Sequence, residues 1–237
     1  MTADNSPTIV LCPGFMTDRT LWRDMEPGLQ ALAPCHFADL SGMTDIEATA
    51  RDLLDAVPGP LVPVGFSMGG FVAREMALAA PERVRGLVLM GTSARPTRPE
   101  IQARNEALIR STRERGYRGL SPAAVRKGFH PSTRDTNPDV DFVLRMALRM
   151  GPQAFINQLS LDRRDGRPHL AKIKCPTLVI WPRQDDMRSL KESEELANGI
   201  PGARLEIIED CGHMMPLEKP QECLRLIADL HAVASKG

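Results

Sequence analysis

The five residues Gly65–Gly69, with the sequence Gly-Phe-Ser-Met-Gly, constrain the fold of this chain more than any others. They lie between an apolar run at 61–64 and a segment whose apolar residues have helical spacing. In a strand–turn–helix context, Gly-x-Ser-x-Gly forms a sharp turn that exposes the serine hydroxyl, and its small residues let the backbone pack closely. The string alone is weak evidence, because glycine and serine are common in ordinary turns. The segments before and after the string must therefore show whether it forms this kind of turn or an ordinary one.

Short apolar runs alternate with helical segments along most of the chain. Strands are predicted at 8–11, 36–40, 61–66, 84–90, 177–181 and 203–208. Helices are predicted at 19–33, 45–57, 68–80, 189–198 and 220–235, with Asp18 capping the first and a Thr44–Glu47 capping box opening the second. This alternation predicts a mostly parallel sheet with helices on both faces, an α/β fold.

Residues 95–170 break the alternation, because they contain only helical patterns, at 100–115, 121–127, 139–150 and 152–161. They predict a helical lid inserted into a core formed by 1–94 and 171–237. Open α/β sheets bind ligands at the carboxyl ends of their strands, so such an insertion would cover the site. The stretch 95–135 carries ten basic and four acidic residues, which an ordinary solvated helical face also explains.

Composition excludes several classes of protein. The 237 residues are 42% hydrophobic and 25% charged, and Lys+Arg and Asp+Glu are both 30, which argues against binding to nucleic acid or anionic membrane. No apolar stretch is long enough to insert into a membrane and no leader pattern is seen, so a cytoplasmic location is expected. Five cysteines without a Cys-x-x-Cys pair favour reduced thiols over a disulfide framework or a zinc site. No metal and no organic cofactor is implied.

A serine nucleophile needs a base, and the base needs a group that orients it. His213 follows the predicted strand at 203–208 across a short turn, which puts it at the same edge of the sheet as Ser67. The other histidines are interpreted as structural or solvated; they are His36, His130, His169 and His231.

The orienting acid is expected between the nucleophile and the base in chain order. Asp185 and Asp186 both follow the predicted strand at 177–181, and either carboxylate could accept the Nδ1 proton of His213. Aspartate is also a good helix cap. One of the two is therefore expected to cap the next helix and the other to orient the base.

Taken together, the chain resembles the α/β-hydrolase fold superfamily over nearly its whole length. The resemblance is carried by Pro13-Gly14-Phe15, 65–70, Pro81-Glu82-Arg83-Val84, 176–180 and Cys211-Gly212-His213. It implies an α/β-hydrolase fold in which Ser67, Asp185 and His213 are catalytic. In the family the acid ends a Gly-x-x-Asp pattern, here Pro182-Arg183-Gln184-Asp185, so Asp185 is preferred and Asp186 is the reserve.

The resemblance also implies an oxyanion hole made by two backbone N–H groups, those of Phe15 and Met68. Two features depart from the family pattern. Pro13-Gly14 stands where His-Gly is common, but that position is not the donor. The loop at 39–44 is shorter than the usual one, which leaves the subfamily open.

The expected function is hydrolysis of carboxylic esters with small to medium, largely apolar acyl groups, through an acyl-enzyme. Met16, Met146 and Met214 are candidate walls of an apolar pocket, although ordinary core packing explains them equally well. The expected partner is a small-molecule ester, and the basic lid suggests an acidic carrier protein, as in the carrier-protein methyl-ester esterases that the chain resembles. The alternatives are a carbon–carbon bond hydrolase, lactonase, thioesterase or haloperoxidase with the same triad, or a non-catalytic ligand-binding member of the fold.

Overall fold

The computed structural model describes residues 6–236, so most of the N-terminal segment in which no leader pattern was expected lies outside the described residues. Six parallel strands form one sheet in the order β2-β1-β3-β4-β5-β6. Their bounds are β1 Thr8–Cys12, β2 Cys35–Phe37, β3 Leu61–Phe66, β4 Leu87–Met90, β5 Thr177–Pro182 and β6 Arg204–Ile208. The predicted parallel sheet is confirmed, and every residue of the inner strands β3, β4 and β5 is buried.

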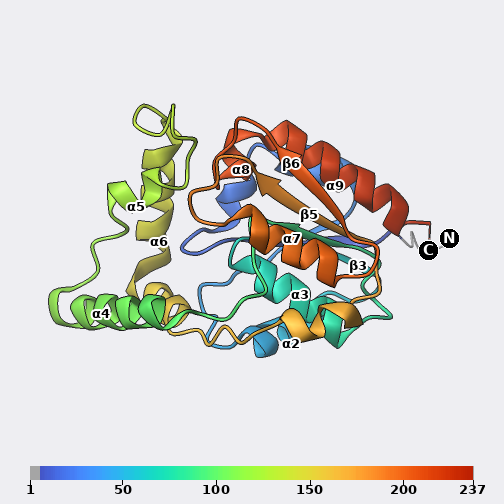
Figure 1. The fold of residues 1–237 in the computed structure, drawn as a ribbon, viewed down its shortest axis with the longest axis horizontal. Coiled ribbons are helices and arrows are strands. Elements are labelled where there is room, and N and C mark those ends of the chain that lie inside the picture. The colour runs from blue at the N-terminus through green and yellow to red at the C-terminus, as the bar shows by residue number, and fades with distance from the viewer. Residues whose placement is uncertain (1–5, 237) are drawn as a thin grey trace.

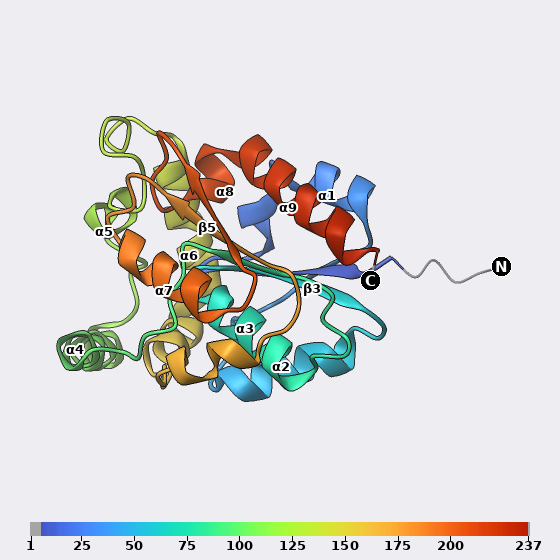
Figure 2. The same ribbon diagram turned by 45° about the vertical axis from the view of Figure 1, so that its right-hand side comes forward.

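Helices cover both faces of the sheet, as predicted (Figures 1 and 2). On one face lie α1 Glu26–Leu32 and α9 Pro220–Ala234, whose buried leucines join the main core cluster. On the other lie α2 Ile46–Ala56, α3 Gly69–Ala79 and α7 Leu190–Gly199. Between β6 and α9, the short helix α8 Met215–Glu218 follows the loop that carries His213. No helix in the stretch 6–236 has the length and apolar character needed to span a bilayer.

Two predicted helix starts are wrong. The segment 19–33 is not one helix: a 3-10 turn, η1 Arg19–Trp22, precedes α1, because Pro27 has no N–H to continue a helix from the preceding turn. Asp18 caps η1 instead, accepting a hydrogen bond from Thr20 N at 2.8 Å. The helix α2 begins at Ile46, one residue later than a capping box at Thr44 requires. Its cap is therefore Asp45, whose side chain accepts a hydrogen bond from Ala48 N.

The predicted strand at 84–90 is also shorter in the structure. Val84 makes only an isolated bridge with Leu61, and regular pairing with β3 begins where Val88 meets Val64. The strand β4 therefore starts at Leu87.

Three helices between β4 and β5 stand at one end of the sheet (Figure 1). They are α4 Pro99–Arg115, α5 Pro122–Arg126 and α6 Asp139–Leu159, whereas the 3-10 segment η2 Arg167–Lys172 packs beside α7. The two helices predicted at 139–150 and 152–161 correspond to the two parts of α6, which is interrupted at Gly151 with φ 80°, just before Pro152. The helix α4 contains no buried residue, so it is the most exposed part of this helical insertion.

Candidate active site

Ser67 lies in the turn between β3 and α3, at the carboxyl end of the sheet. Its φ of 49° places a non-glycine residue in the left-handed region, a conformation that surrounding structure must hold in place. Two hydrogen bonds supply this support: Ser67 N donates to Met90 O at 2.8 Å, and Thr92 Oγ1 donates to Ser67 O at 2.7 Å. The end of β4 and the residues after it therefore fix the serine backbone.

The glycines on either side of Ser67 are required by close backbone contacts. A Cβ atom on Gly69 would lie 2.1 Å from the carbonyl oxygen of Cys12, because α3 begins directly against the end of β1. A Cβ atom on Gly65 would lie 2.5 Å from Gly70 Cα. Neither contact is physically tolerable, so the Gly-x-Ser-x-Gly pattern follows from the tight packing of the turn.

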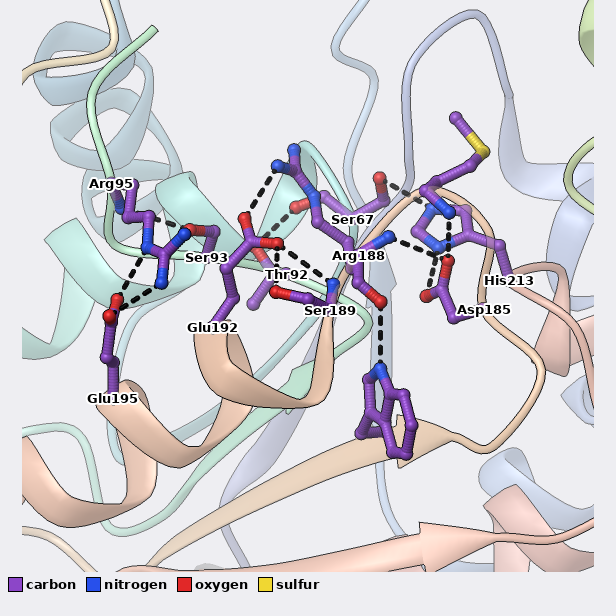
Figure 3. A network of polar contacts seen from close by, with 12 residues as sticks. Ser67, Thr92, Ser93, Arg95, Asp185, Arg188, Ser189, Glu192, Glu195 and His213 are labelled. Atoms are coloured by element: carbon purple, nitrogen blue, oxygen red, sulfur yellow. Dashed lines mark hydrogen bonds and ion pairs between the residues drawn. The ribbon is translucent and has the colours of Figure 1, made fainter. Parts of the chain in front are cut away.

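Ser67, His213 and Asp185 form a chain of hydrogen bonds (Figure 3). Ser67 Oγ lies 2.9 Å from His213 Nε2, and His213 Nδ1 lies 2.7 Å from Asp185 Oδ2. The side chains of His213 and Asp185 are 3% and 0% exposed, whereas Ser67 is partly exposed. This geometry lets an imidazole take the proton of an accessible hydroxyl while a buried carboxylate stabilises the resulting positive charge.

The two aspartates after β5 are in different environments. Asp185 Oδ1 accepts hydrogen bonds from Met187 N at 2.7 Å and Arg188 N at 2.8 Å, which orient the carboxylate toward His213. Asp186 is exposed and forms an ion pair with Arg134 at 3.1 Å. The structure therefore brings Asp185, and not Asp186, to the histidine.

Neither aspartate caps α7, so that expectation is wrong. The helix begins only at Leu190, and its N-cap is Ser189, which forms a capping box with Glu192. Ser189 N donates to Glu192 Oε2 at 2.9 Å. Residues 186–188 thus separate Asp185, which faces His213, from the start of the helix.

Gly91 and Glu218 lie next to the loop that carries His213. Gly91, with φ 53°, leaves room for the imidazole, because a Cβ atom there would lie 3.2 Å from His213 Cε1. Glu218 accepts hydrogen bonds from Gly212 N at 2.9 Å and from His130 N at 2.7 Å. Burial raises the pKa of the Glu218 carboxyl group. The base loop is thus joined to the helical insertion through one carboxylate.

The backbone N–H groups of Phe15 and Met68 have no hydrogen-bond acceptor among the described residues. Met68 follows the serine, and Phe15 lies in the loop after β1, where a Cβ atom on Gly14 would approach Ser67 Cβ to 3.5 Å. Two unpaired N–H groups beside a serine are what an oxyanion site requires. Both donors remain predictions, because the role depends on where an oxyanion would sit.

Gln158 of α6 supports the loop after β1. This side chain is 1% exposed; its Oε1 accepts from Met16 N at 2.9 Å and its Nε2 donates to Leu40 O at 3.1 Å. Met16 has a φ of 53°, so the bond holds a strained residue directly after Phe15. No sequence pattern indicates this contact, because 142 residues separate its partners.

We expect a Gln158→Leu variant to lower kcat about 10- to 100-fold, since the N–H of Phe15 would lose its fixed direction. The measurement is kcat and KM for p-nitrophenyl butyrate, together with the thermal unfolding midpoint. The matched control is Gln153→Leu, because Gln153 is on the same helix but exposed, and within 6–236 its side chain bonds only to Asn157. A lowered unfolding midpoint with kcat within about twofold of the parent would show a structural role alone.

The three candidate pocket methionines are buried in packed clusters. Met16 lies with Ala147, Ala154 and Phe155 of α6, whereas Met146 and Met214 belong to the main core cluster. Met146 Sδ also accepts from Asp18 N at 3.1 Å. Packing thus accounts for all three positions, and a role in the pocket wall stays a prediction.

The buried cysteines do not offer a competing nucleophile. Burial raises the pKa of the Cys12 thiol to about 12, and it also raises the pKa of Cys211 and Cys223. These thiols therefore stay protonated near neutral pH. Within 6–236 no three His, Cys, Asp or Glu side chains are grouped so that they could hold a metal ion.

Comparison with known proteins gives the family of the chain. The sequence profile described as the alpha/beta hydrolase family matches residues 9–226. The chain is 30% identical to the pimeloyl-acyl-carrier-protein methyl ester esterase of Aromatoleum aromaticum, over 95% of this chain and 98% of that protein. It is 29% identical to the enzyme of the same name from Neisseria meningitidis serogroup B, over 86% of this chain and 85% of that protein.

A solved structure is also similar over most of its length. An esterase from Thermogutta terrifontis, solved with malate bound, superposes with a TM-score of 0.88 and is 28% identical. The match covers 96% of this chain and 90% of the esterase.

Proposed function

Because the chain belongs to the α/β-hydrolase family, we propose that it is a serine hydrolase that cleaves carboxylic esters through an acyl-enzyme. The observation that carries this proposal is the continuous chain of hydrogen bonds from Asp185 through His213 to the accessible hydroxyl of Ser67. The esterase relatives support the same class of reaction.

In the proposed reaction, Ser67 Oγ attacks the acyl carbon while His213 Nε2 takes its proton. The N–H groups of Phe15 and Met68 stabilise the oxyanion, and Asp185 stabilises the imidazolium. The carbon–oxygen bond to the alcohol then breaks, and the alcohol leaves with the proton from His213. Water next gives a proton to His213 and its oxygen to the acyl carbon, and the carboxylic acid leaves as Ser67 regains its proton.

The substrate is proposed to be a small to medium, largely apolar ester, and no metal or organic cofactor takes part. We assign 1–94 and 171–237 to the catalytic core and 95–170 to a lid. The experiment is covalent labelling by a serine-directed phosphonate, with peptide mapping, beside a screen of esters, lactones, thioesters and vinylogous diketones. Labelling at Ser67 with ester turnover is the expected result, whereas an unlabelled Ser67 would contradict a hydrolase function.

A carrier protein is a second candidate for the substrate, because two relatives are named for esterase activity on a carrier-protein ester. Six exposed basic residues of the lid support it, because among the described residues these six form no ion pair. They are Arg104, Arg110, Arg113, Arg115, Arg118 and Lys127. An acidic carrier would meet uncompensated positive charge there.

An Arg110→Gln/Arg113→Gln variant tests this docking surface. Each exposed ion pair is worth about 0.2–1 kcal/mol, so KM for a methyl ester on an acyl carrier protein should rise roughly two- to tenfold. The KM of a small neutral ester should not change. Arg51→Gln/Arg204→Gln is the control with equal charge loss outside the lid. The idea fails if the lid variant behaves like the control on both substrates.

A further inference from the structure

The loop after α5 in the helical insertion lies directly against the loop that carries His213. On one side of the base, Met214 N donates a hydrogen bond to Gly128 O at 2.8 Å. On the other side, a Cβ atom on Gly212 would lie only 2.4 Å from the carbonyl carbon of Phe129, whose side chain is fully buried. Both residues that flank His213 in the chain are therefore in contact with the insertion.

Glu218, at the end of α8, makes a second connection between these two loops. Its Oε2 accepts a hydrogen bond from Gly212 N at 2.9 Å, and its Oε1 accepts one from His130 N at 2.7 Å. The side chain is half-buried, and within 6–236 it forms no ion pair. A partly buried carboxylate without a cation costs free energy unless hydrogen bonds compensate its charge, and such charge-assisted bonds are stronger than those between neutral groups. The two backbone N–H groups supply this compensation, and the carboxylate thereby joins the loops.

The imidazole of His213 must be placed correctly at both of its nitrogens. Its Nε2 lies 2.9 Å from Ser67 Oγ and its Nδ1 lies 2.7 Å from Asp185 Oδ2, so a shift of the loop would disturb both contacts. A misplacement of about 1 Å in a catalytic site can cost about 10²-fold in rate. The acid loop holds the base loop further back, where Gln184 N donates to Cys211 O at 3.0 Å. The two residues that flank the base are instead bonded to the insertion, one directly and one through a carboxylate.

We propose that Glu218 is a positioning residue: it joins the loop of the base to the insertion and so holds His213 in the direction from which it can take the proton of Ser67. The inference rests on the proposed hydrolase function, and it gives the insertion a part in the chemical step, apart from any contact with the substrate. The carboxylate acts through Gly212, because among the described residues its hydrogen bonds go to backbone N–H groups and not to the triad. If it served the fold alone, its loss would lower stability and leave the rate per active molecule unchanged.

The first test measures kcat and KM for p-nitrophenyl butyrate in Glu218→Ala and Glu218→Gln, with kcat divided by the fraction of Ser67 that a phosphonate labels. We expect kcat to fall at least about tenfold in Glu218→Ala, which loses both hydrogen bonds. Glu218→Gln keeps one acceptor oxygen, but its amide nitrogen cannot accept from an N–H. Its loss in kcat should therefore be smaller, although at least about threefold. KM should stay within about twofold of the parent, because the carboxylate positions the base and does not bind substrate.

The matched control is Glu222→Gln, in the first turn of α9. Glu222 is also half-buried, but within 6–236 its side chain makes no hydrogen bond and no ion pair. The control removes the same charge and should keep the kcat of the parent. Thermal unfolding midpoints show whether each variant is folded, and Glu218→Gln carries the test if Glu218→Ala does not fold. A kcat per labelled Ser67 within about twofold of the parent in a folded Glu218 variant overturns the proposal, whether or not the midpoint falls.

Amide hydrogen exchange separates this proposal from the proposed function, because it requires no turnover. The amides of Gly212 and His130 should both exchange at least about tenfold faster in Glu218→Ala than in the parent, and one of the two should do so in Glu218→Gln. Both should exchange at the parent rate in Glu222→Gln. If the parent protein hydrolyses no ester but these differences appear, the hydrolase function fails and the connection between the loops stands. Exchange of both amides at the parent rate in a folded Glu218 variant overturns the connection, even where kcat has fallen.

Discussion

A Ser67→Ala variant is expected to lose about 10⁴- to 10⁶-fold in kcat toward p-nitrophenyl butyrate, because removing a nucleophile disables the triad as a unit. The Ser67 hydroxyl lies 2.9 Å from His213 Nε2 and is the accessible end of the hydrogen-bonded chain. The fold should be unaffected, since the bonds that hold the turn are made by the backbone of Ser67 and by Thr92. The residual rate would report only the oxyanion donors and substrate binding.

The measurement combines kcat with phosphonate labelling and a thermal unfolding curve. Ser235→Ala is the control, because Ser235 is exposed at the end of α9. The control should retain the activity and the labelling of the parent. Activity of the Ser67→Ala protein within about tenfold of the parent would rule out an acyl-enzyme at this residue.

The Asp185→Asn variant is expected to lose about 10⁴-fold in kcat, whereas Asp186→Asn should stay within about threefold of the parent. An amide in place of the Asp185 carboxylate presents a donor or a weaker acceptor to His213 Nδ1, which disfavours the tautomer that can accept the serine proton. Asp186 is exposed and pairs with Arg134, so its loss removes only a surface interaction.

The two aspartate variants serve as controls for each other, since each removes one negative charge from the same loop. Thermal unfolding should be similar for both, because in Asp185→Asn the amide oxygen of the new side chain could still accept hydrogen bonds from Met187 N and Arg188 N. Equal losses in both variants, or a larger loss in Asp186→Asn, would contradict the assignment of Asp185.

The parts of the site that the sequence could predict are those defined by local patterns. The strand predicted at 61–66 has the same bounds as β3, and the turn at Gly65–Gly69 follows it, because a continuous apolar run marks a strand buried on both faces. His213 could be placed at the correct edge because parallel strands end at one edge of the sheet. Its hydrogen bonds depend on side-chain directions, which only the structure gives.

The rest depends on contacts between distant segments. The residues alone left Asp185 and Asp186 open, because both follow β5 and only the direction of each side chain distinguishes them. The sequence does not reveal the roles of Gln158 and Glu218, because a glutamine within a helix and a glutamate at the end of a short one have no local feature that indicates a distant backbone partner.

The bond from Gln158 to Met16 N has a consequence for engineering the protein. Exchanging lids between related enzymes is a direct way to alter the range of substrates. In this protein such an exchange would also replace the side chain that fixes the loop after β1, and with it the direction of a predicted oxyanion donor. A chimera that keeps a glutamine at position 158 separates the two effects. Any change in its substrate range is then due to the new lid and not to a lower rate of the chemical step.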